Sequence, residues 1–396
     1  MAETFGEALR RLRGTRSLRA VGELASCGKS YVSDLEHGRR QPAMQTAQAL
    51  DDALCADGEL VALAAVRPGV TPLEQADAIQ AGLDEMLATG PLADSSLDEI
   101  EWTVDRHGRA TRYRPEGTHF PELIGDFQDL RVLLTRRHPA PARRHLLIAA
   151  ARMSGLTALT LLKLGDERAN SWWRTARKAA AAADDRATLS WVYAQEAYQS
   201  YYGGDLYSAL ELAARAQQLA GGLPCVGPAL AAPLEARAHA RLGDADRVAA
   251  ALDAAEVALA RLPADEQIGS AFGYSESQLR FHSGNALVHL GDLGRARVEL
   301  ERAAELYPVA ERMDRALVSL DQAMCAAAAG DPAGAADQAA RTLLGLRPEH
   351  RTALIVYRAR EVVDSVPPGA RGVHEVRALR EIIALPSGDA ERASAN

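Results

Sequence analysis

Apolar side chains three and four positions apart predict a set of short helices over residues 4–65. Ser17 stands where it can cap the second helix, and Gly38 can supply the left-handed residue that ends the third. No window shows the sustained apolar–polar alternation of a strand. The pattern therefore predicts an all-α, five-helix module, whose buried faces are Phe5–Leu9–Leu12, Leu18–Val21, Val32–Leu35, Met44–Ala47–Leu50–Leu54 and Leu60–Leu63.

From residue 146 onward, a Gly-Asp pair recurs at the end of an apolar helical pattern. Its glycines stand at 165, 204, 243, 291 and 330, with spacings of 39, 39, 48 and 39 residues. Small residues at a fixed offset let two antiparallel helices approach closely. The repeat therefore predicts a solenoid of helical hairpins, in which the small residue seven positions before each glycine is Ala158, Ala197, Ala236, Gly284 or Ala323.

These patterns divide the chain into four predicted parts: a helical module (1–66), a helical linker with a degenerate leading hairpin (67–145), the repeat array (146–366), and a capping helix with a disordered tail (367–396). Within the linker we expect one helix over 72–90 and two more over 95–108 and 120–138, the last ending before Pro139. The apolar face of 373–383 predicts the cap, and the tail is expected after Pro386.

Charge is distributed unevenly along the chain. The net charge is −8, yet residues 1–42 carry eight Lys or Arg against five acids. A basic head on an acidic body suits one DNA-facing module. The four cysteines (27, 55, 225, 325) form no metal-binding pattern, and no run approaches 18 apolar residues. We therefore expect a cytoplasmic protein with no metal, no cofactor and no membrane segment.

The segment from Gly22 to Ser30 differs from the phosphate-binding loop motif by one extra residue. Five residues separate Gly22 from Gly28-Lys29-Ser30, whereas that loop requires four and a buried strand before it. The preceding stretch is rich in arginine. A helix, a short turn and a second helix fit the segment better, which is a helix-turn-helix.

Residues 4–65 resemble the lambda-repressor-like (XRE) DNA-binding family, through the run "YVSDLEHGRRQP" at 31–42. The resemblance implies that Lys29, Ser30 and Asp34 face base edges, and that Arg39 and Arg40 meet phosphate. It also implies that Val32, Leu35 and Gly38 are structural, and that Glu36 pairs with Arg11 of the first helix. The partner would be a double-stranded, palindromic operator.

Two residues depart from the usual pattern of that family. Gly28 replaces a Ser or Thr cap, which is expected to cost a few tenths of a kcal/mol. Gly22 replaces a small alanine and is expected to loosen the second helix by up to about 1 kcal/mol. A helical bundle that has lost DNA binding is the alternative interpretation.

The array resembles tetratricopeptide repeats, most clearly in "GNALVHLGDLGRARVELERAAELYP" at 284–308. The resemblance implies a concave groove that binds a peptide or a small anionic effector. Its lining would include Arg152 and Lys163 from the first repeat. Packing between hairpins is the alternative role for the aromatic residues in the remaining set: Trp191, Ala194, Tyr198, Tyr201, Tyr202, Arg237, Arg241, Gln278, Phe281, Asn285 and His289.

A DNA-binding head followed by such repeats resembles ligand-responsive regulators of the RRNPP type and similar actinobacterial proteins. That implies a homodimeric transcriptional regulator whose groove binds an effector and alters DNA binding. The alternative is a scaffold that docks a protein partner and carries an autoregulatory head. An enzyme is the weakest candidate, because "GYSES" (273–277) lacks the closing glycine of a nucleophile elbow and no HExxH run exists.

Overall fold

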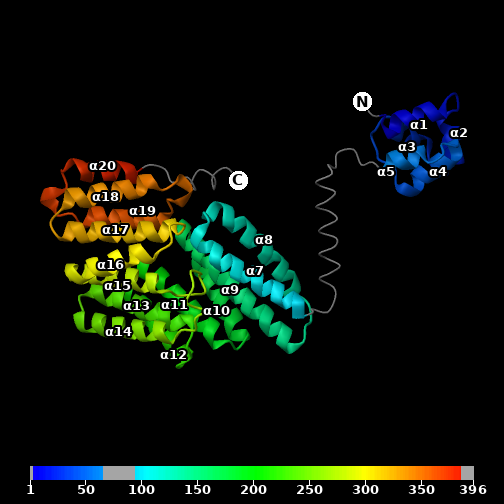
Figure 1. Cartoon of the computed structure of the whole chain (residues 1–396). Helices are drawn as coiled ribbons and strands as arrows, with labels where there is room; N and C mark the ends of the chain where they lie inside the picture. Colours follow the sequence, from blue (N-terminus) through cyan, green and yellow to red (C-terminus); the bar gives the residue numbers. More distant parts are fainter. Residues whose placement is uncertain (1–2, 66–93, 385–396) are drawn as a thin grey trace. The chain divides into compact units, whose positions relative to one another are not determined.

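The computed structural model describes residues 3–65 and 94–384 of the chain, and these form only helices, turns and loops, as predicted (Figure 1). The chain divides into two compact units, Met1–Gly90 and Pro91–Asn396. The helix predicted over 72–90 and the tail predicted after Pro386 lie outside the described residues.

The first unit contains the five predicted helices: α1 (Phe5–Arg13), α2 (Leu18–Leu24), α3 (Lys29–Glu36), α4 (Met44–Leu54) and α5 (Glu59–Ala65). Thr4 and Glu7 form a capping box that begins α1, and the Ser17 hydroxyl accepts the Ala20 amide at the start of α2. The apolar faces of all five helices meet in one core that includes Leu9, Val32 and Leu50.

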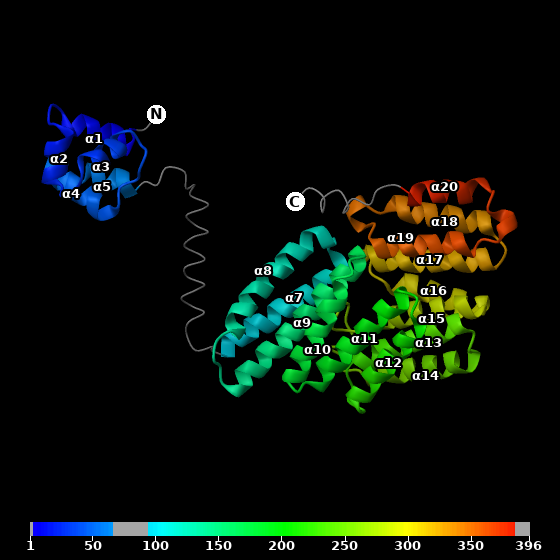
Figure 2. The ribbon, with the colours of Figure 1, turned by 180° about the vertical axis from the view of Figure 1, so that it is seen from behind.

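The second unit is an array of antiparallel helix pairs that stack in chain order (Figures 1 and 2). Its helices are α7 (Asp94–Tyr113), α8 (Glu116–Leu134), α9 (Ala140–Leu164), α10 (Ala169–Ala182), α11 (Arg186–Tyr202), α12 (Leu206–Ala220), α13 (Val226–Leu242), α14 (Ala245–Arg261), α15 (Glu276–Leu290), α16 (Leu293–Leu306), α17 (Arg312–Ala328), α18 (Pro332–Gly345), α19 (Ala353–Ser365) and α20 (His374–Ile383).

The recurring Gly-Asp pair makes the turn inside each hairpin. All five glycines have positive φ, from +75° to +91°, which a side chain would disfavour. In four of the five turns the following aspartate caps the next helix through its carboxylate, as Asp205 does with the Ser208 amide. The small residue before each turn is buried, and a Cβ added to Gly284 would lie 2.6 Å from Leu300. The predicted close helix approach is confirmed.

Helices α7 and α8 pack on α9 and extend the array at its beginning. The C-terminal end of α7 also reaches α17, where Arg112 Nη2 lies 3.0 Å from Glu311 and 3.3 Å from Asp314. Helix α9 contacts α19 as well, since a Cβ on Gly165 would lie 3.2 Å from Ala353. Helices from the beginning of the array therefore contact helices near its end.

Helices α20 and α9 have distinct roles in the array. Helix α20 packs Val376 and Leu379 against α18 and α19, which confirms the helix predicted over 373–383. Helix α9 is long and apolar enough to cross a membrane by length and composition, but two-thirds of its apolar window is buried inside the array. It is a core helix of this unit.

Candidate nucleic-acid interface and candidate ligand cavity

Helix α3 presents a polar face to solvent at its N-terminal end. Lys29 and Ser30 are its first two residues, and both are exposed. A helix and a turn, rather than a strand, lead into Gly28, so the segment is not a phosphate-binding loop. On the opposite face, Val32 and Leu35 are buried in the core of the module. This is the division of faces that a helix needs in order to enter the major groove of DNA.

The residues after α3 continue the polar face. Gly38 has φ +65° and turns the chain away from the helix, as predicted. Arg39 and Arg40 are exposed, and each lies 3.9 Å from an oxygen of the half-buried Asp34 carboxylate. The Arg40 guanidinium also stands over the Tyr31 ring at 5.9 Å. Asp34 is therefore placed to orient the two arginines.

The prediction that Glu36 pairs with Arg11 is wrong. The buried Glu36 carboxylate accepts hydrogen bonds from Arg13 Nε at 2.5 Å and Nη2 at 3.2 Å, and Arg10 Nη2 donates to the Glu36 carbonyl. Arg11 instead pairs with Glu3 and Glu59 on another side of α1. The reason is helical geometry, because residues three apart share a face and position 11 is rotated by about 100° from position 10.

Gly22 makes a close contact with the turn after α2, which its low helix propensity does not reveal. A Cβ at this position would lie 2.6 Å from the Cys27 carbonyl oxygen, and the Cys27 amide donates to the Gly22 carbonyl at 2.7 Å. Glycine is what lets the turn close tightly against α2, so it positions α3. Gly28 does lack a side-chain cap, as expected.

The residues predicted to line an open groove are mostly buried. Fewer than one part in ten of the side-chain surface is exposed for eight of them: Trp191, Ala194, Tyr198, Tyr201, Arg237, Gln278, Phe281 and Asn285. Tyr202, Arg241 and His289 are half-buried. Arg152 lies over the Phe272 ring at 5.1 Å, and Lys163 lies between Glu116 and the Thr111 carbonyl. The expected open groove is therefore largely filled.

A loop of this chain fills part of it. Residues 262–275 join α14 to α15 and contain the extra residues of the 48-residue spacing. The Trp191 indole N–H donates to the Ala271 carbonyl at 2.7 Å, and the Ala271 amide donates to the Gly108 carbonyl at 2.9 Å. Phe272 packs on the Trp191 ring at 5.0 Å. The loop thus bonds through its backbone to α11 and α7.

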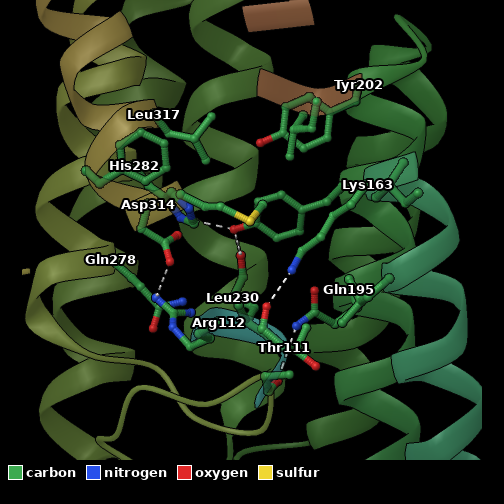
Figure 3. A pocket seen from close by; sticks show the side chains of 17 residues that line it. Thr111, Arg112, Lys163, Gln195, Tyr202, Leu230, Gln278, His282, Asp314 and Leu317 are labelled. Atoms are coloured by element: carbon green, nitrogen blue, oxygen red, sulfur yellow. Dashed lines mark hydrogen bonds and ion pairs between the residues drawn. The ribbon is translucent and has the colours of Figure 1, made fainter. Parts of the chain in front are cut away.

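A cavity of about 150 Å³ remains inside the array, between α7, α9, α11, α13, α15, α17 and α19 (Figure 3). Figure 3 shows Tyr202 at one end and Thr111 and Arg112 at the other. The wall is mostly apolar, from Leu230, Phe281 and Leu317 among others. The residues of this wall that sequence reasoning missed are Thr111, Arg112, Leu159, Leu162, Gln195, Leu230, Ala271, His282, Met313, Asp314, Leu317 and Leu354.

The polar groups of this cavity are held in fixed orientations. The Tyr198 hydroxyl donates to the Leu230 carbonyl at 3.1 Å and shares a hydrogen bond with His282 Nδ1 at 3.0 Å. Burial, together with the nearby Arg237 and Arg112, lowers the pKa of His282 well below its usual value, so the ring is neutral. Lys163 Nζ donates to the Thr111 carbonyl at 2.6 Å. The arrangement suits a compact, partly apolar ligand.

A comparison with known protein families supports the helix-turn-helix assignment of the first unit. Residues 4–64 match the family model described as a helix-turn-helix domain. No curated protein and no solved structure matches the chain significantly. The chain thus carries an N-terminal helix-turn-helix domain, the kind of domain found in DNA-binding regulators, followed by a helical array.

Proposed function

We propose that this protein is a sequence-specific transcriptional regulator whose DNA affinity is controlled by a small molecule bound inside the helical array. The exposed face of α3, with Lys29, Ser30 and the two arginines after it, supports the DNA-binding part. The 150 Å³ cavity is the observation that carries the effector part. A cavity of about this volume holds a molecule of roughly the size of benzene.

The loop at 262–275 favours a small molecule over a peptide. An extended peptide needs side chains that are free to bond its backbone. The indole of Trp191 already bonds the loop's own backbone, and Gln195 Nε2 donates to the same carbonyl at 3.4 Å. Arg112 lines one end of the remaining cavity, where it is paired with the acids Glu311 and Asp314.

The proposal includes a cytoplasmic homodimer. Heads of the repressor type read two half-sites about one helical turn apart, roughly 34 Å, so a palindromic operator implies two copies. The cavity touches seven helices of the array, including α7 at its beginning and α19 at its end. A ligand that changes their packing would shift the equilibrium between two array shapes and alter the fit of the two heads.

The test combines an operator selected from random duplexes with fractions of small molecules from cell extract. We expect one fraction to change the affinity of the full chain several-fold. Leu354→Trp, which fills the cavity from its half-buried rim, should abolish the response and keep the operator affinity. Leu344→Trp, at an exposed position of α18, is the matched control. A full response in Leu354→Trp would refute the cavity as the effector site.

A docked protein partner is the second candidate. It is favoured by a groove of about 760 Å³ between α8, α9 and α10, lined by Phe127, Leu134, Leu147 and Trp172 and edged by Arg131 and Lys178. Exposed apolar grooves of this kind mark interaction sites. Phe127→Asp should prevent co-purification of a stoichiometric partner under this alternative and should leave effector response intact under the first.

A further inference from the structure

Arg237 is a fully buried cation that lacks a direct acidic partner. Its Nε donates to Asn285 Oδ1 at 2.7 Å, and its Nη1 donates to the Tyr202 hydroxyl at 3.4 Å. Both acceptors are neutral. Among residues 3–65 and 94–384, no carboxylate lies within ion-pair distance of this guanidinium, and its Nη2 has no hydrogen-bond partner. A buried charge in this condition is costly unless an anion compensates it.

A second arginine on the same face of α13, the half-buried Arg241, also lacks an ion pair among the described residues. Arg241 follows Arg237 by one helical turn, and both guanidinium groups lie over the Tyr201 ring, at 5.3 and 4.5 Å. Like charges four residues apart repel each other. No ion pair is formed by Arg241 within the described parts of the chain, and its Nη1 is buried without a partner.

The acids nearest to these arginines are already paired. Asp321 bonds Asn285 and the guanidinium of Arg358, and Glu361 bonds the same Arg358. His289 stands among all three arginines, and burial together with their charges lowers its pKa to about 3, so it is neutral. The guanidinium groups of the three arginines outnumber the carboxylates of Asp321 and Glu361, so this region carries one excess positive charge.

Five atoms in this cluster are buried without a hydrogen-bond partner in the described residues, and all five can donate a hydrogen bond. They are Arg237 Nη2, Arg241 Nη1, Arg358 Nε, Tyr201 Oη and His289 Nε2. The C-terminal ends of α11, α13 and α15 lie here, and their dipoles offset part of the charge. They do not supply acceptors for the five atoms.

We propose that this cluster, named the arginine cluster and comprising Arg237, Arg241, Arg358, Tyr201 and His289, binds an oxyanion, the carboxylate or phosphate group of a small molecule. Planar guanidinium donors match the oxygens of both groups. The cluster stands directly behind the cavity, because Arg237 lies over Tyr202 and Phe281, which line it. Arg241 and His289 are half-buried, so part of each residue is exposed to solvent at the edge of the cluster. The inference rests on the proposed function only in assigning this anion to the effector.

Calorimetric titration of the full chain with sodium phosphate and, separately, with succinate tests the inference, with sodium chloride at matched ionic strength as the reference. We expect saturable binding of at least one of the two anions, with one site per chain. Phosphate alone would indicate a phosphorylated ligand, succinate alone a carboxylate ligand, and either supports the site. Arg241→Gln should weaken binding at least tenfold, as loss of a charged donor does.

The matched control is Arg360→Gln, on the exposed face of α19 close to Arg358 in sequence, and it should leave binding unchanged. If Arg241→Gln does not fold, His289→Asn removes another of the five donors and gives the same reading. Absence of saturable binding to both anions, or equal affinity in wild type and Arg241→Gln, would overturn the inference. Neither outcome depends on DNA, so the regulator proposal is judged separately by its operator assay.

Discussion

The two units of this protein use polar side chains in opposite ways. In the helix-turn-helix unit, the cations predicted to bind DNA are exposed on α3 and on the turn after it: Lys29, Arg39 and Arg40. In the array, the polar side chains predicted to line the groove form hydrogen bonds within the protein. Arg237 bonds Asn285, Trp191 bonds loop 262–275, and Lys163 bonds α7. An exposed polar face can bind a large polyanion such as DNA, whereas a filled interior leaves room only for a small ligand.

The largest expected effect comes from opening the contact between α7 and α17. Arg112→Ala leaves the nearly buried Glu311 carboxylate without its cation, which should cost the array about 3–5 kcal/mol of unfolding free energy. All four tryptophans lie in the array, so denaturant unfolding followed by their fluorescence reports on that unit alone. Arg114→Ala, whose partner Glu122 is exposed, is the control and should cost at most about 1 kcal/mol. Equal losses of unfolding free energy in the two variants would show that the contact between α7 and α17 stabilises the array no more than an exposed ion pair does.

Acid should destabilise the array next most strongly. Burial, with the charges of His107, Lys163 and Arg114, lowers the pKa of His119 to about 4. Between pH 6.5 and 4 the unfolded chain binds a proton there that the folded chain does not, so stability falls as the pH falls. The loss from this residue should reach about 2 kcal/mol by pH 5. His119→Gln should reduce the pH dependence of the fluorescence midpoint; an unchanged slope would exclude His119 as a cause.

A smaller effect, on binding rather than stability, is expected at the start of α3. Lys29→Ala should weaken operator binding by about 1–3 kcal/mol if the side chain reads a base, and it should leave unfolding unchanged because Lys29 is exposed. Lys178→Ala, an exposed lysine of the array, is the matched control. Fluorescence anisotropy with a labelled operator measures both. Equal affinities for the two variants would remove Lys29 from the interface.

The smallest effect separates two neighbouring arginines of α1. Arg13→Ala removes the cation closest to the buried Glu36 and should cost the first unit about 1–2 kcal/mol, because Arg10 remains nearby. Arg11→Ala breaks only exposed pairs and should cost less than about 1 kcal/mol. Far-UV circular dichroism of the thermal transition of the first unit compares them. A larger loss in Arg11→Ala would contradict the observed pairing.

The helices and hairpin turns could be predicted because their signals are local. Apolar spacing, a capping serine and a glycine with positive φ act within a few residues, and each Gly-Asp pair specifies its own turn. The pairing of Glu36 with Arg13 could also have been predicted from local geometry, because Arg10 and Arg13 share one face of the helix and Arg11 lies on another.

The interior of the array could not be predicted in the same way. The 48-residue spacing reveals an insertion, but not that its Ala271 forms backbone hydrogen bonds to Trp191 of α11 and to Gly108 of α7. The pairing of Arg112 with Glu311 joins residues almost 200 positions apart, and no local pattern encodes it. The geometry of tetratricopeptide repeats, in which the groove stays open, predicts the groove positions but not the loop that fills part of the groove.

Hydrogen exchange of the full chain, alone and bound to its selected operator, is the most direct test of DNA binding by α3. We expect DNA to slow exchange at the backbone amides of residues 28–40, around α3 and the turn after it, and to leave α11, α13 and loop 262–275 without direct protection. Protection by DNA that is confined to the array, with residues 28–40 unchanged, would contradict DNA binding by α3.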